Sequence, residues 1–140
     1  MELKRGRMID HLHLRARDLE ASRRFYSAVL GVLGIEIVNA PDHFFADELW
    51  VDHGETSSHV HFAFQSPDRA TVERWYAAGL AAGGKGNGGP GERPYHPGYY
   101  AAFLLDPDGN NVEAVYHGPG KRSAEAVTIT VGVERRKVVL

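Results

Sequence analysis

The sequence of 140 residues contains no cysteine. Thiolate metal ligands, disulfide bonds and a cysteine nucleophile are therefore excluded. Long apolar runs are missing too, since none approaches the ~20 residues that span a bilayer, and the charged start lacks the apolar core of a signal peptide. An excess of one charge is also lacking, because the net charge is −2. We therefore expect a cytoplasmic protein that partners neither nucleic acid nor a membrane.

Histidine, by contrast, is plentiful, with eight in the chain. The segment 11–16 alternates polar and apolar residues, as a half-buried β-strand does. Its apolar side chains would face a hydrophobic layer, which leaves His11, His13 and Arg15 together on the other face. Two histidines and an arginine on one strand face suit a pocket better than an ordinary surface.

The same pattern recurs later in the chain. The segment 59–64, which begins with His59 and His61, repeats 11–16 position by position. The helical segment 74–78 likewise repeats 24–28, so that residue types and element order recur together. Two unrelated amphipathic helices after two alternating strands are the plainer alternative. We interpret the recurrence as two copies of one structural module.

Each module reads as a strand, a helix and further strands. For the first module we expect a strand over 8–16, a helix capped by Asp18 and running through Leu30, a strand over 35–39 and one or two strands over 43–53. For the second we expect a strand over 59–64, a helix with Ser66 as its cap and Pro67 at its first position, a loop over 83–98 with at most one short strand, and a hairpin of 99–105 and 110–117 around the turn 106–109. Residues 126–133 could add a strand, and the charged tail 134–140 has no functional interpretation.

The predicted fold is therefore α+β. Two repeated β-α-β-β-β modules, 8–54 and 58–117, would form a curved mixed sheet around a concave cleft, with the helices on the outside. Residues 118–140 would be a C-terminal extension of this single domain, 1–140. The length also allows two small fused modules.

A metal site is one explanation of the histidines. His11 and His59 are equivalent positions and could approach each other near a pseudo-twofold axis. Glu113, an acid among apolar residues, needs its charge compensated if it is buried. A divalent cation held by two imidazoles and a carboxylate would compensate it and leave coordination positions open. The alternatives are hydrogen-bonded strand histidines and a surface charge on an edge strand.

The motifs carry a family resemblance as well. The segment 11–15 leading into 18–26 resembles the opening of the vicinal oxygen chelate superfamily, which includes glyoxalase I, the bleomycin- and fosfomycin-resistance proteins and the extradiol dioxygenases. The segment 106–113, DPDGNNVE, resembles its closing hairpin, whose glutamate is the last metal ligand. The resemblance covers 8–117 and implies a single glyoxalase-like domain. It implies a divalent ion, Ni²⁺, Zn²⁺, Mn²⁺ or Fe²⁺, held by His11, His59 and Glu113.

Glyoxalase I has a further glutamate ligand in the last strand of its first module. Glu48 could supply it, yet aligning the ends of the two strands places Leu49 opposite Glu113, so this question stays open. Arg15 matches an arginine that helps to hold glutathione and is a candidate anion-binding residue or a salt bridge across the sheet. Asp52 stands where glyoxalase I has an asparagine, and its charge would repel a carboxylate. This departure argues against lactoylglutathione lyase activity.

The resemblance implies a metal-dependent enzyme acting on a small oxygen-bearing substrate. Isomerase or lyase chemistry would need a base, for which Glu113, His13 and His61 are candidates. Oxygenase chemistry would require Fe²⁺, and a non-catalytic protein that sequesters a small molecule is the alternative. The segment 93–100 is a candidate pocket wall or an ordinary surface loop, and it adds Tyr95, His96 and Tyr100 to Arg15 as candidate substrate-binding residues. A homodimer is common in similar proteins.

Overall fold

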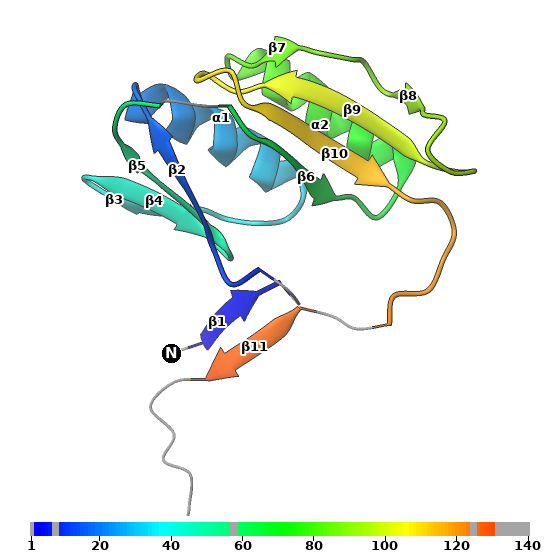
Figure 1. Ribbon diagram of the computed structural model, residues 1–140, viewed down its shortest axis with the longest axis horizontal. Coiled ribbons are helices and arrows are strands. Elements are labelled where there is room, and N and C mark those ends of the chain that lie inside the picture. The colour runs from blue at the N-terminus through cyan, green and yellow to red at the C-terminus, as the bar shows by residue number, and fades with distance from the viewer. Residues whose placement is uncertain (1, 7–8, 57–58, 124–125, 131–140) are drawn as a thin grey trace, which may run out of the picture.

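The computed structural model describes residues 2–6, 9–56, 59–123 and 126–130 (Figure 1). The first module contains β2 (Leu12–Ala16), α1 (Leu19–Val32), β3 (Val38–Ala40), β4 (His43–Ala46) and β5 (Leu49–His53). The second contains β6 (His61–Gln65), α2 (Arg69–Ala81), β7 (Lys85–Gly86), β8 (Gly91–Glu92), β9 (Tyr100–Leu105) and β10 (Asn111–Tyr116). A separate antiparallel pair joins β1 (Glu2–Arg5) to β11 (Val127–Thr130). The α+β class and the two repeated modules are confirmed.

Each module builds its own mixed sheet. In the first the strand order is β2-β5-β4-β3, with β2 parallel to β5. In the second it is β6-β10-β9-β7, with β8 also paired to β9 and β6 parallel to β10. The described strands of the two modules therefore form two separately hydrogen-bonded sheets rather than one continuous curved sheet. In Figure 1 both helices lie behind the strands, α1 behind β6 and α2 behind β9 and β10.

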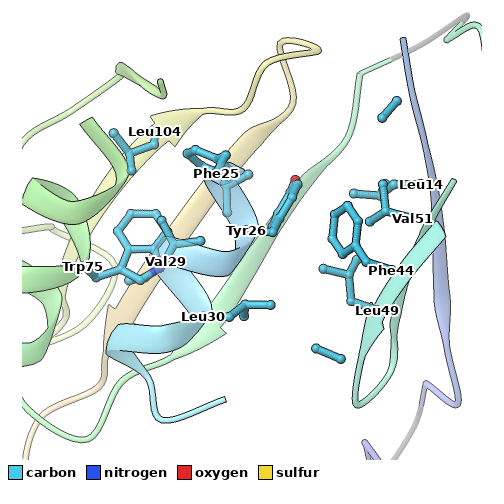
Figure 2. Close-up of a cluster of buried hydrophobic side chains, with 14 of the residues drawn as sticks. Leu14, Phe25, Tyr26, Val29, Leu30, Phe44, Leu49, Val51, Trp75 and Leu104 are labelled. Carbon is cyan, nitrogen blue, oxygen red and sulfur yellow. The ribbon is translucent and has the colours of Figure 1, made fainter. Parts of the chain in front are cut away.

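A single buried cluster draws on both modules (Figure 2). Phe25 and Val29 of α1 approach Trp75 of α2, whereas Tyr26 and Leu30 lie toward the first sheet. The two helices pack against each other, and α2 covers β9 and β10. Neither helix in the described parts of the chain has the length and apolar composition to cross a membrane.

A buried polar contact fastens the first helix to the hairpin of the second module. The hydroxyl of Tyr26 donates to Asp106 Oδ2 over 2.6 Å. Asp106 also accepts from the backbone N–H groups of Asp108 and Asn110, which holds the turn closed. Burial, and then the charge of Asp106, raise the pKa of Tyr26 well above its ordinary value. This contact fixes the position of the turn between β9 and β10 relative to α1.

The helix starts test the capping predictions. Asp18 caps α1 as expected, and its carboxylate accepts from the N–H of Ala21. The Ser66 prediction is wrong, because Asp68 caps α2 and accepts from the N–H of Thr71 over 2.7 Å. A carboxylate is a stronger acceptor for a free helical N–H than a hydroxyl. Pro67 therefore precedes the cap instead of occupying the first helical position.

Several strand boundaries also differ from expectation. β2, the first strand of the first module, begins at Leu12. The 43–53 segment forms two strands, one of the two expected outcomes, and they are divided at Asp47, whose φ is 46°. The loop 83–98 holds two short strands, β7 and β8, where at most one was expected. α1 continues through Gly31 to Val32. Residues 131–140, including the charged tail, lie outside the described residues.

Candidate functional site

The two sheets each turn one face away from the buried core. On the first sheet, Leu14 and Ala16 of β2 are buried, as the alternation predicts, while His13 and Arg15 are exposed. We call the face that carries His13 and Arg15 the open face of the first sheet. The ladders place the following further residues on it: Trp50 and Asp52 of β5, and His43 and Phe45 of β4.

A histidine and a carboxylate pair on this face. His13 Nε2 lies 2.8 Å from Asp52 Oδ1, and Arg15 Nε lies 3.4 Å from the same oxygen. Arg15 therefore forms the salt bridge across the sheet that was one of its two interpretations. Because an ionised carboxylate only accepts hydrogen bonds, His13 donates through Nε2, which leaves Nδ1 as the acceptor of a neutral ring.

The second sheet repeats this pair in a more buried form. His61 Nε2 lies 2.8 Å from Glu113 Oε1, and the hydroxyl of Tyr99 donates to Glu113 Oε2 in a short hydrogen bond. Glu113 is only 3% exposed. Burial, followed by the bond to Glu113, raises the pKa of Tyr99 to about 12. Tyr99 is thus a site residue that the sequence reasoning missed by one position.

The strand registers identify the first-module counterpart of Glu113. Asp52 pairs with Arg15 on β2, and Glu113 pairs with Ala63, which is the Arg15 position of β6. Asp52 is therefore the counterpart of Glu113, and the two His–carboxylate pairs are equivalent. The sequence repeat does not show this equivalence by itself, because it also depends on the strand registers.

The register also answers on which face Glu48 lies. The β2–β5 ladder begins with Leu12 opposite Leu49, so His11 and Glu48 immediately precede it. Leu49 is 5% exposed and belongs to the core cluster. Glu48, not Leu49, shares the open face with His11.

A cavity of about 500 Å³ lies against this face. The residues that line it are His11, His13, Phe45, Asp47, Glu48, Leu49 and Trp50. A smaller cavity of about 170 Å³ lies where the modules meet, lined by His13, Leu14, Arg15, Glu55, Thr56, Val60 and Asn110. The larger cavity thus belongs to one module, whereas the sequence predicted a cleft shared by two.

The predicted metal ligands occupy separate places. The imidazole of His11 lines the larger cavity and pairs with Asp10, whose Oδ1 is 2.7 Å from Nδ1. The ring of His59 packs against the hairpin turn at Gly109. Glu113 already has both carboxylate oxygens hydrogen-bonded. No three histidine, aspartate or glutamate side chains in the described part of the chain are arranged to hold a metal ion. Within one chain, these residues do not fit the ion that the resemblance implies.

The segment 93–100 divides between two faces. His96 Nε2 lies 2.8 Å from His117 Nδ1, and the Tyr99 ring makes edge contacts with both imidazoles. Tyr95 is 70% exposed and contacts the edge of Tyr99. Tyr100 instead donates to Glu73 of α2 and lies on the helix side of the sheet. His96 and Tyr95 therefore gather around Tyr99, the residue that bonds Glu113, and Tyr100 does not.

Comparison with known proteins assigns the family. The family model described as the Glyoxalase/Bleomycin resistance protein/Dioxygenase superfamily matches residues 8–114. The chain belongs to this superfamily. No curated protein matches the sequence.

Solved structures agree with this assignment. A glyoxalase/bleomycin resistance protein from Albidiferax ferrireducens T118 is 30% identical, with a TM-score of 0.68 over 77% of this chain and 97% of the other. A glyoxalase-related enzyme from Fulvimarina pelagi is 21% identical, with a TM-score of 0.67 over 86% and 97%. Lactoylglutathione lyase from Agrobacterium tumefaciens is 24% identical, with a TM-score of 0.59 over 79% and 93%. The Fulvimarina and Agrobacterium proteins, both under 25% identical, are similar to this chain in fold.

Proposed function

We propose that this protein binds a small organic molecule in the cavity on the open face of its first sheet. The observation that carries the proposal is the cavity itself, about 500 Å³ in volume, with the rings of Phe45 and Trp50 and the imidazoles of His11 and His13 in its lining. Ligand sites typically combine mostly apolar walls with a few polar groups, in volumes of roughly 300–1,000 Å³. Membership of a superfamily that includes bleomycin resistance proteins supports a binding role.

Blocking the cavity tests this proposal. Amide NMR spectra of metal-free protein are recorded with a collection of small organic molecules, and dissociation constants are measured for those that bind. His11→Trp inserts a bulky ring at an exposed position of the cavity, and His53→Trp makes the same change at an exposed position outside its lining. We expect His11→Trp to weaken binding at least about tenfold, or ~1.4 kcal/mol, and His53→Trp to leave it unchanged. Equal affinities in the two variants would contradict the proposal.

A second candidate is a metal-dependent enzyme with small-molecule isomerase or lyase activity, as the resemblance implies. Two observations favour it. His11 and Glu48 line one cavity, and Asp10 holds the His11 ring so that Nε2 keeps its lone pair, as metal-binding histidines are commonly held. Glu113 is a nearly buried carboxylate with His61 beside it. In this proposal Glu113, His13 or His61 serves as the base.

This second candidate requires the predicted metal ligands, which lie apart within one chain, to come together. We propose a homodimer in which His11 and Glu48 of one copy approach His59 and Glu113 of the other around Ni²⁺, Zn²⁺, Mn²⁺ or Fe²⁺. Elemental analysis after dialysis, combined with the molar mass in solution, tests it. We expect a dimer with one ion per chain, lost in His59→Ala and kept in His53→Ala. A wild-type protein with as little metal as His59→Ala would refute the metal site.

A further inference from the structure

The aromatic side chains of Phe45, Trp50 and His13 form a row across the open face of the first sheet. The ladder sets Phe45 of β4 opposite Trp50 of β5, and Trp50 opposite His13 of β2. The Trp50 ring lies 4.1 Å from the His43 ring at 13° and 5.6 Å from the Phe45 ring at 10°. Both stacking partners come from β4. His13 lies on β2, on the other side of β5 from these two rings.

The row is only partly covered. Phe45 and Trp50 are half-buried, and Val38, which extends the row on β3, is 51% exposed. Sheet residues that merely support the core turn their rings inward, as Phe44 does on the same strand. Large apolar groups kept together on an outer face indicate a binding surface. Phe45 and Trp50 line the 500 Å³ cavity.

A hydrogen bond to a carboxylate determines which ring nitrogen carries the proton in each of the two cavity imidazoles. Asp52 accepts a hydrogen bond from Nε2–H of His13, and Asp10 accepts one from Nδ1–H of His11. In the neutral rings the remaining nitrogens, Nδ1 of His13 and Nε2 of His11, can only accept a hydrogen bond. A ligand that pairs with them must therefore bring an O–H or N–H donor.

We propose that the ligand of this cavity is a planar aromatic molecule that carries a hydrogen-bond donor. Its ring stacks on the free face of Trp50, and its O–H or N–H donates to Nδ1 of His13. Parallel offset stacking is a favoured arrangement of aromatic rings, which a saturated ring of the same size cannot reproduce. This inference rests on the proposed small-molecule function and specifies its ligand class.

Three probe molecules test separately whether the ligand needs a planar ring and whether it needs a hydrogen-bond donor. 2-Naphthol has both the planar ring and the donor. 2-Methoxynaphthalene keeps the ring without the donor, and decahydro-2-naphthol keeps the donor without the planar ring. Dissociation constants are measured by amide NMR titration of metal-free protein. We expect 2-naphthol to bind more tightly than either of the other probes and to shift the amides of residues 11–13 and 45–50.

Matched variants then locate the contacts. Trp50→Leu keeps an apolar side chain but removes the ring, and we expect it to weaken 2-naphthol about two- to tenfold, as the loss of one aromatic pair implies. His13→Phe removes the acceptor and should abolish the preference for 2-naphthol over 2-methoxynaphthalene. Phe103→Leu removes a ring from the outer face of the other sheet. It should change neither the affinity for 2-naphthol nor the preference for it over 2-methoxynaphthalene. Amide spectra of each variant without ligand confirm that it is folded.

The outcomes distinguish this inference from the proposed function. If decahydro-2-naphthol binds at the cavity as tightly as 2-naphthol, the aromatic ligand class is refuted and small-molecule binding stands. If none of the three probes binds, the aromatic ligand class is refuted, whereas the proposed function is refuted only if no molecule of the larger collection binds the cavity. An equal loss in Phe103→Leu and Trp50→Leu would refute the stacking site.

Discussion

Removing one buried hydroxyl tests how the two modules are joined. Tyr26 is fully buried, and its hydroxyl donates to Asp106 Oδ2 over 2.6 Å. Tyr26→Phe deletes only this oxygen, so the ring keeps its packing against Phe25 and Phe44. Asp106 keeps its three hydrogen bonds within the turn and loses the one that reaches α1.

The expected loss of stability follows from the type of bond. A hydrogen bond to a charged group contributes roughly 1.5–3 kcal/mol, and the whole folded state is typically stable by about 5–15 kcal/mol. We expect Tyr26→Phe to lower the free energy of unfolding by about 2 kcal/mol near neutral pH. Urea denaturation followed by tryptophan fluorescence measures it, since Trp75 is fully buried and becomes exposed on unfolding. Tyr95→Phe, at a 70% exposed site, is the control and should change stability by less than about 0.5 kcal/mol.

Alkaline pH supplies a second readout of the same contact. The folded protein raises the pKa of Tyr26 well above the value of about 10 in an unfolded chain. The folded state therefore keeps a proton that the unfolded state releases, and stability falls as the pH rises above about 10. The variant lacks this titration, so the stability gap between wild type and Tyr26→Phe should narrow from about pH 9 to about pH 11. A loss equal to that of Tyr95→Phe, or a gap independent of pH, would refute the role given to this bond.

Two further predictions concern the helix contact and the second-module site. A Cβ at Gly79 would lie 2.1 Å from a buried Leu104 methyl, so Gly79→Ala should destabilise by about 1–3 kcal/mol in the same assay. Gly31→Ala, which meets nothing within 4 Å in α1, should stabilise by about 0.5–1 kcal/mol, and a loss there would contradict the steric argument. Tyr99→Phe leaves Glu113 buried with one fewer donor and should cost about 1–3 kcal/mol by urea denaturation. Ultraviolet titration should also lose the tyrosine that ionises near pH 12 in the folded protein, and an unchanged titration would refute the assigned pKa.

The candidate site shows where sequence reasoning stops. The alternation of segment 11–16 placed His13 and Arg15 on one face and Leu14 on the other, because side-chain direction in a strand depends only on position. It could not tell which residue of another strand lies beside them. Asp52 was read as a repelling charge, yet the ladder puts it against both His13 and Arg15.

Neighbouring tyrosines make the same point. Tyr99 and Tyr100 are adjacent in the sequence and chemically identical, and only one can face Glu113. The start of β9 decides which, because a shift of one residue reverses the face of every side chain in the strand. The sequence offered Tyr100 as a candidate substrate-binding residue, whereas Tyr99 is the tyrosine that bonds Glu113.

The sequence by itself determined the repeated modules, the closing hairpin and the family, because these depend on residue types at fixed separations along the chain. Tertiary structure alone decided the partners of each polar group. It made Asp52 the counterpart of Glu113, set His11 beside Glu48 and apart from the other predicted ligands, and aligned Trp50 with Phe45 along one cavity wall. Register and module packing bring these residues together across long sequence separations, and no local periodicity encodes either of them.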